Sequence, residues 1–114
     1  MSQKRGTKSE FLIIWEFRVR PGKRRAFEKA YGPDGDWGQF FRTGKGYICT
    51  ELLSDRGTPL RYLTLDFWAS RTDYERFKKE NRAEYQAIDE KYESLTEKEV
   101  EIGQFTLGRR LGAR

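Results

Sequence analysis

The order of patterned segments in this 114-residue chain predicts an α+β domain built around one antiparallel sheet. Four segments are rich in β-branched and aromatic residues, as strands are. Two segments with apolar residues at steps of three or four, the helical spacing, separate the first strand from the second and the third from the fourth. The order is therefore βαββαβ, which predicts a ferredoxin-like fold with a four-stranded antiparallel sheet and the helices on one face.

The first strand is predicted over residues 11–20, where alternate positions are apolar or aromatic. Pro21 and Gly22 end this strand, because both residues favour turns. A short helix is predicted over residues 23–31, whose apolar residues gather on one helical face. The Gly-Pro-Asp-Gly sequence of residues 32–35 then predicts a turn.

A second, short helical piece follows this turn. Asp36 can cap it, and it carries the aromatic residues Trp37 and Phe41. The second strand is predicted over residues 47–53 and the third over residues 60–68, with a hairpin-type connection containing Gly and Pro between them.

A long amphipathic helix of roughly 24 residues is predicted to begin at Ser70. Ser70 and Asp73 have the spacing of a capping box, which favours a helix start at this point. We expect the helix to bend near Asn81, a polar residue within its apolar stripe. The fourth strand is predicted over residues 99–107.

The charge distribution divides the chain into a domain and two ends. Residues 1–10 are predicted to be a disordered basic leader, residues 11–107 a single domain, and residues 108–114 a basic tail. The two ends account for the whole net charge of +5, so acidic and basic residues balance in the domain itself. A nucleic-acid-binding domain carries its basic patch on the folded body, so we expect no nucleic-acid partner.

Other compositional features exclude several kinds of protein. The apolar run of residues 11–15 is too short to cross a membrane, which favours a cytoplasmic location. The single cysteine, Cys49, cannot form an internal disulfide, which favours a reducing compartment. The absence of histidine excludes His-based triads, imidazole metal sites and His-ligated haem. We expect no metal and no cofactor, although a metal site built from carboxylates alone stays open.

Strand alternation predicts what each face of the sheet carries. We expect the helices to cover Leu63, Leu65 and Phe67 together with the odd-numbered residues of the first strand. The opposite face would then display Tyr62, Thr64, Asp66, Trp68, Leu12, Ile14, Glu16 and Arg18. An exposed face with this many aromatic residues is expected to be covered. Two copies packed face to face would form a homodimer that encloses a partly polar interior.

With these segments in place, the chain resembles the antibiotic biosynthesis monooxygenase-like family of dimeric α/β-barrel proteins over about residues 11–107. The resemblance depends on the Pro-Gly-Lys sequence of residues 21–23, on the Asp-Phe-Trp-Ala-Ser sequence of residues 66–70, and on the aromatic helix that follows. The family includes cofactor-free oxygenases of polyketide aromatics and haem-degrading enzymes. The haem-degrading branch uses Asn, Trp and His, and the matching positions here hold Glu16, Phe77 and Gln86. The resemblance therefore implies no haem chemistry.

The resemblance implies a cofactor-independent oxygenase acting on a small aromatic, phenol- or hydroquinone-like substrate. In this hypothesis Asp66 or Glu16 is the base, and Arg18 and Tyr62 stabilise an oxyanion. The candidate substrate-binding residues are Trp68, Tyr62, Asn81, Trp37 and Phe41. The cofactor-free oxygenases share no fixed catalytic set, so no residue role is carried over from them.

Each candidate residue also has a structural interpretation. The carboxylates can form ion pairs with Arg18 or Arg61, the aromatic residues can pack in the core, and Asn81 can mark a helix bend. The alternative function is a non-catalytic homodimeric module that binds a small ligand or serves in assembly. The sequence leaves open whether the protein is an enzyme.

Overall fold

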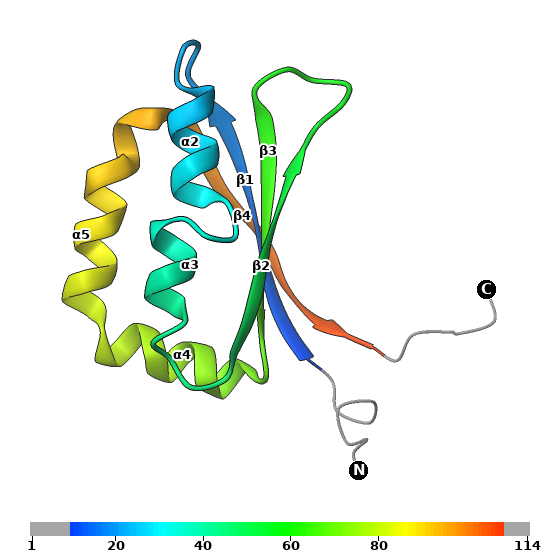
Figure 1. Cartoon of the computed structure of the whole chain (residues 1–114). Coiled ribbons are helices and arrows are strands. Elements are labelled where there is room, and N and C mark those ends of the chain that lie inside the picture. Colours follow the sequence, from blue (N-terminus) through cyan, green and yellow to red (C-terminus); the bar gives the residue numbers. More distant parts are fainter. Residues whose placement is uncertain (1–9, 109–114) are drawn as a thin grey trace.

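The computed structural model describes residues 10–108, which form a four-stranded antiparallel sheet with the strand order β2-β3-β1-β4. The strands are β1 (Glu10–Val19), β2 (Tyr47–Ser54), β3 (Arg61–Trp68) and β4 (Thr96–Leu107). Within residues 10–108, all the helices lie on one side of this sheet, and no helix covers the other side (Figure 1). The predicted ferredoxin-like α+β fold is confirmed. The predicted leader and tail lie outside the described residues, apart from Glu10, which begins β1, and Gly108.

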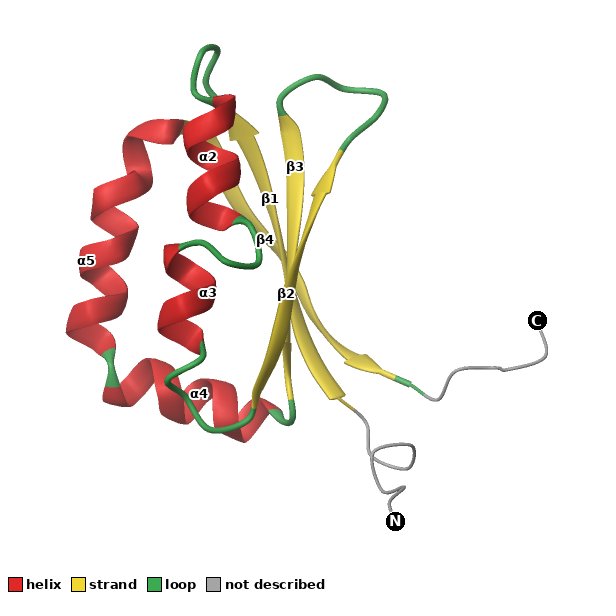
Figure 2. Cartoon of the chain, viewed as in Figure 1, coloured by secondary structure: helices red, strands yellow, loops and turns green. Residues whose placement is uncertain are grey.

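The helices are α2 (Arg24–Tyr31), α3 (Asp36–Phe41), α4 (Arg71–Glu80) and α5 (Arg82–Tyr92), and a 3-10 turn, η1 (Glu93–Leu95), leads into β4. Figure 2 shows that α4 runs across one end of the sheet, whereas α5 runs roughly along the sheet. None of these helices is long and apolar enough to cross a membrane.

The predicted long helix is two helices, with the break at the residue where a bend was expected. Asn81 has a non-helical backbone (φ −124°, ψ 33°) between α4 and α5. Its side-chain amide donates a hydrogen bond to the carbonyl oxygen of Phe77 at 2.9 Å, which satisfies a backbone group at the end of α4. The predicted helix start is also confirmed, because the Ser70 hydroxyl accepts a hydrogen bond from the backbone N–H of Asp73 at 3.1 Å.

The predicted orientation of β3 is wrong. Directly paired residues of neighbouring antiparallel strands lie on the same face, and β3 pairs Trp68 with Phe11 and Asp66 with Ile13. The even-numbered residues of β3 therefore face the helices with the odd-numbered residues of β1. All four of them are buried: Tyr62, Thr64, Asp66 and Trp68.

We call the opposite, uncovered side of the sheet the open face. It carries Leu12, Ile14, Glu16, Arg18, Cys49, Glu51, Leu53, Leu63, Leu65, Phe67, Lys98, Val100, Phe105 and Leu107. Four of its large apolar residues are 38–45% exposed: Leu53, Val100, Phe105 and Leu107. The expectation of an uncovered face rich in apolar residues is met, but a different row of β3 supplies that face.

Candidate functional site

A cavity of about 140 Å³ lies between the sheet and the helices. Its lining residues are Trp15, Phe17, Thr50, Thr64, Asp66 and Glu99 from the strands, and Tyr31, Trp37, Phe41, Lys78, Tyr85 and Asp89 from the helices. A cavity of about 150 Å³ in another protein holds benzene, so this one has room for a single aromatic ring. Within residues 10–108 no group of three or more His, Cys, Asp and Glu residues is placed to hold a metal ion.

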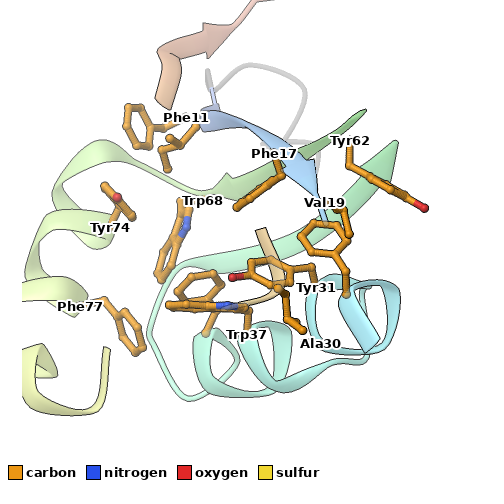
Figure 3. Close-up of a cluster of buried hydrophobic side chains, with 14 residues drawn as sticks. Phe11, Phe17, Val19, Ala30, Tyr31, Trp37, Tyr62, Trp68, Tyr74 and Phe77 are labelled. Atoms are coloured by element: carbon orange, nitrogen blue, oxygen red, sulfur yellow. The ribbon is translucent and has the colours of Figure 1, made fainter. Parts of the chain in front are cut away.

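Aromatic side chains make up half of the residues that line the cavity. The ring of Trp37 on α3 lies 5.0 Å from that of Tyr85 and 5.6 Å from that of Phe41, measured between centroids. The rings of Phe17 and Tyr31 lie 4.9 Å apart, and the Tyr31 ring lies 6.2 Å from that of Trp37. Figure 3 shows Tyr31 and Trp37 facing Phe17 from their helices. This contact network holds α2 and α3 against the sheet and fixes the shape of the cavity.

Asp36 attaches α3 to α5. Its carboxylate accepts a hydrogen bond from the Tyr92 hydroxyl and lies 3.4 Å from the Lys91 ammonium. The hydrogen bond from Tyr92 is the main reason that the pKa of Asp36 lies below its ordinary value. Trp37 follows Asp36 directly, so this attachment also positions an aromatic wall of the cavity.

Asp66 is the most buried acid of the cavity, with only 8% of its surface exposed. Burial raises the pKa of its carboxyl group to about 6, and a hydrogen bond from Thr50 opposes the rise. That bond runs from the Thr50 hydroxyl to Asp66 Oδ1 at 2.7 Å. The second oxygen, Oδ2, has no hydrogen-bond partner among the described residues. Asp66 can therefore exchange a proton near neutral pH with a molecule in the cavity.

A second hydroxyl extends this hydrogen-bonded chain toward the edge of the sheet. Tyr47 Oη lies 2.7 Å from Thr50 Oγ1. Thr50 has one hydroxyl hydrogen, which it gives to Asp66, so Tyr47 is the donor in this contact. The chain from Tyr47 through Thr50 to Asp66 joins the buried carboxylate to β2, an edge strand.

Two further carboxylates lie near the rim of the cavity. Burial raises the pKa of Glu99 on β4, and the negative charge of Asp89 on α5 raises it further. Burial also raises the pKa of the Tyr31 and Tyr85 phenols, so both keep their protons at neutral pH. The ammonium of Lys78 lies 5.2 Å from the centroid of the Tyr85 ring.

The structure brings together three of the eight residues that the sequence proposed for the site. Asp66, Trp37 and Phe41 line the cavity. Trp68 is completely buried and does not line it, since its ring packs against the rings of Phe41, Tyr47, Tyr74 and Phe77.

Tyr62 and Asn81 lie outside the cavity as well. The Tyr62 hydroxyl donates a hydrogen bond to the carboxylate of Glu28. In Figure 3 the Tyr62 ring points away from the centre of the aromatic cluster. The Asn81 side chain donates its hydrogen bond to the Phe77 carbonyl at the junction of α4 and α5.

Glu16 and Arg18 lie on the open face, so the expected grouping of these two residues with Asp66 is wrong. Side chains alternate between the two faces of a strand, and the even-numbered residues of β1 point away from the helices. Glu16 forms an ion pair with Arg61 at 2.6 Å, one of the structural alternatives that the sequence left open. Hydrogen bonding to Arg61 lowers the pKa of Glu16. Arg18 cannot stabilise an oxyanion formed beside Asp66, because the sheet separates them.

Sequence reasoning missed Thr50, Trp15, Tyr85, Asp89 and Glu99. Thr50 pairs directly with Asp66 across β2 and β3, a relation that depends on strand register. Trp15 belongs to the odd-numbered row of β1, which was correctly expected to face the helices. This row was the sequence signal that could have identified Trp15 as a residue of the cavity wall. The sequence alone gave no signal that would bring Asp89 near Glu99.

Residues 10–91 match the family model described as antibiotic biosynthesis monooxygenase. No match was found among the curated proteins.

Solved structures share the fold at low sequence identity. SnoaB from Streptomyces nogalater, a cofactor-independent oxygenase, was solved in a mutant form that is 17% identical, with a TM-score of 0.68 over 90% of this chain and 97% of that chain. A conserved protein from Methanosarcina mazei Go1 is 11% identical, with a TM-score of 0.64 over 95% of this chain and 100% of its own. At these identities the likeness shows the fold alone.

Proposed function

Because the chain belongs to the antibiotic biosynthesis monooxygenase family, we propose that it is a cofactor-independent oxygenase of a small aromatic, phenol- or hydroquinone-like substrate. The observation that carries the proposal is the position of Asp66 in an aromatic cavity with room for one ring. Asp66 is a buried carboxylate whose Oδ1 accepts a hydrogen bond and whose Oδ2 accepts none among residues 10–108. SnoaB, which shares the fold, is described as a cofactor-independent oxygenase.

The cavity suits a reaction in which the substrate supplies the electrons. Asp66 Oδ2 accepts the proton of a phenolic hydroxyl, and the resulting anion is electron-rich enough to reduce O2. Oxygen adds to a ring carbon to give a hydroperoxide, which loses water to leave a carbonyl group. One oxygen atom enters the product and the other leaves as water, so hydroquinone and O2 give hydroxyquinone and water.

The surrounding residues support this chemistry. The aromatic walls give the substrate ring an apolar surface to pack against, and the hydrogen bond from Thr50 to Asp66 Oδ1 leaves Oδ2 available to the substrate. Tyr47 and Thr50 donate in sequence toward Asp66 Oδ1, which stabilises the carboxylate form that acts as the base.

The test is oxygen uptake with a hydroquinone series, together with mass-spectrometric detection of one ¹⁸O atom in the product. Asp66→Asn should lower turnover at least a hundredfold, as expected for loss of a general base. Glu16→Gln is the matched control and should keep full activity, because Glu16 lies on the open face. Loss of turnover in Glu16→Gln with retention in Asp66→Asn would refute the assignment. Ligand binding without oxygen uptake would favour the alternative, a non-catalytic ligand-binding module.

We also propose that two copies pack through the open face to form a homodimer, the dimeric α/β barrel expected from the sequence. Support comes from the exposed apolar residues of this face and from Arg18, whose Nε is buried without a hydrogen-bond partner among residues 10–108. Phe105→Glu should give a monomer in native mass spectrometry. The control Ala87→Glu, at an exposed position of α5, should leave the dimer intact.

The cytoplasmic location stays a prediction. It is supported by the single cysteine of the chain.

A further inference from the structure

We infer that the cavity selects an aromatic molecule that carries a protonated amine. The inference rests on the proposed function for the identity of the site, and it adds the charge of the substrate, which the proposed function leaves undefined.

The charges that line the cavity do not balance. Three carboxylates, Asp66, Asp89 and Glu99, face one ammonium group, that of Lys78. Neither Asp89 nor Glu99 forms an ion pair or a hydrogen bond within the described part of the chain. Asp89 is half-buried and Glu99 lies at an exposed position of β4. A bound cation would remove the cost of burying Asp89 without a partner and would offset the repulsion between the two carboxylates.

The two rim carboxylates also repel each other. Asp89 on α5 is close enough to Glu99 on β4 to raise its pKa. All three carboxylates act on the same phenol, since Asp66, Asp89 and Glu99 each contribute to the raised pKa of Tyr85. They do not form a cluster suited to a metal ion among residues 10–108. Spread along the cavity in this way, they match an extended organic cation better than a bare ion.

The aromatic walls favour the same charge. The face of an aromatic ring attracts a cation, and carboxylates beside aromatic rings are a common way to bind an ammonium group. The structure already shows one such contact, because the Lys78 ammonium lies 5.2 Å from the centroids of both Tyr74 and Tyr85. Among the residues that line the cavity, a negatively charged ligand would meet three carboxylates with Lys78 as the one cation to offset them.

The geometry gives the ligand a direction. Its hydroxyl meets Asp66 at the buried end, its ring lies between Trp15 and Trp37, and its ammonium points toward Asp89 and Glu99. The ammonium stays within the cavity lining beside Asp89 and Glu99, because the surface groove beyond Asp89 carries Lys78, Lys79 and Arg82, which would repel it. The substrate class is therefore a ring-hydroxylated arylalkylamine.

The test compares three ligands of one shape and different charge at pH 7: tyramine, 4-ethylphenol and 3-(4-hydroxyphenyl)propionate. Calorimetry measures their affinities for the full-length protein. We expect tyramine to bind about tenfold more tightly than 4-ethylphenol, and the propionate to bind most weakly. The preference for tyramine should fall as salt is added.

Variants then assign the preference to the rim. Glu99→Gln and Asp89→Asn should each reduce the affinity for tyramine about fivefold and leave that for 4-ethylphenol unchanged. Glu90→Gln, an exposed control on α5, should change neither affinity.

Equal binding of tyramine and the propionate by the unmodified protein would overturn the inference, and so would a preference for tyramine that survives both rim substitutions. These outcomes are separate from the proposed function. Oxidation of 4-ethylphenol or hydroquinone without a preference for amines would support the proposed oxygenase function and refute the inferred selection of amines. A preference for tyramine without any oxygen uptake would support the selection of amines and refute the proposed oxygenase function.

Discussion

Replacing Asp66 with Asn should change how the stability of the protein depends on pH. In the folded protein, burial raises the pKa of Asp66 to about 6 from an ordinary value of 3.8. The folded state therefore binds this proton more tightly than the unfolded state does. The stabilisation is fully present below about pH 4 and is lost as the pH rises toward and through 6.

The size of the effect follows from the two pKa values. They differ by about two, and a difference of one corresponds to about 1.4 kcal/mol, so the free energy of unfolding should fall by about 3 kcal/mol across this range. Asn carries no titrating proton. The free energy of unfolding of Asp66→Asn minus that of the unmodified protein should therefore increase by about 3 kcal/mol between pH 3.5 and pH 7.5.

Urea unfolding of both proteins at these two pH values, at one ionic strength, measures this change. Other titrating groups are common to both proteins and cancel in the difference. Asp34→Asn provides a control at a side chain that is 93% exposed. A difference between Asp66→Asn and the unmodified protein that stays constant from pH 3.5 to 7.5 would show that the Asp66 carboxyl is not destabilised by burial. Greater stability at neutral pH together with lost turnover would indicate that the acid is kept for function.

Two further predictions follow from single contacts. Thr50→Val removes the hydrogen bond that opposes the raised pKa of Asp66, so infrared or NMR titration should show this pKa rising by about one or more, whereas Thr50→Ser should keep it near 6. Gly46→Ala should destabilise the protein more than Gly22→Ala in thermal unfolding, by at least about 1 kcal/mol. Both glycines have positive φ, +92° and +84°, but only at Gly46 would a Cβ atom collide with a neighbour, the Asp73 carboxylate. Equal losses for the two glycines would contradict this account.

The order of the elements could be predicted because it depends on local signals. Strand alternation, helical spacing and turn residues act within a few positions of each other. The first three strands accordingly begin and end within one residue of the predicted limits. The fourth strand begins at Thr96, three residues earlier than predicted, because its first residues are polar and carry no strand pattern. Asn81 gave a local signal as well, and the helix is interrupted at this residue, between α4 and α5.

The site could be predicted only in part, because it depends on which row of β3 faces the helices. Alternation shows that Leu65 and Asp66 lie on opposite faces, but it does not show which face is covered. The aliphatic row was expected inside. The register with β1 places Asp66 inside instead, where the Thr50 hydroxyl satisfies one carboxylate oxygen. Register is a non-local property, and a shift of one residue exchanges the two faces.

The orientation of β3 also decides whether the ligand site needs a dimer. The sequence predicted a site enclosed between two sheets, which a monomer would lack. In the structure, the cavity lies between the sheet and the helices, on the side away from the open face. A monomeric Phe105→Glu variant should therefore bind 4-ethylphenol with an affinity within about twofold of that of the unmodified protein. Calorimetry measures this affinity at a protein concentration at which the variant stays monomeric. Loss of binding on conversion to the monomer would place the site between the two sheets. Glu16 and Arg18, which lie on the open face, would then again be candidate site residues.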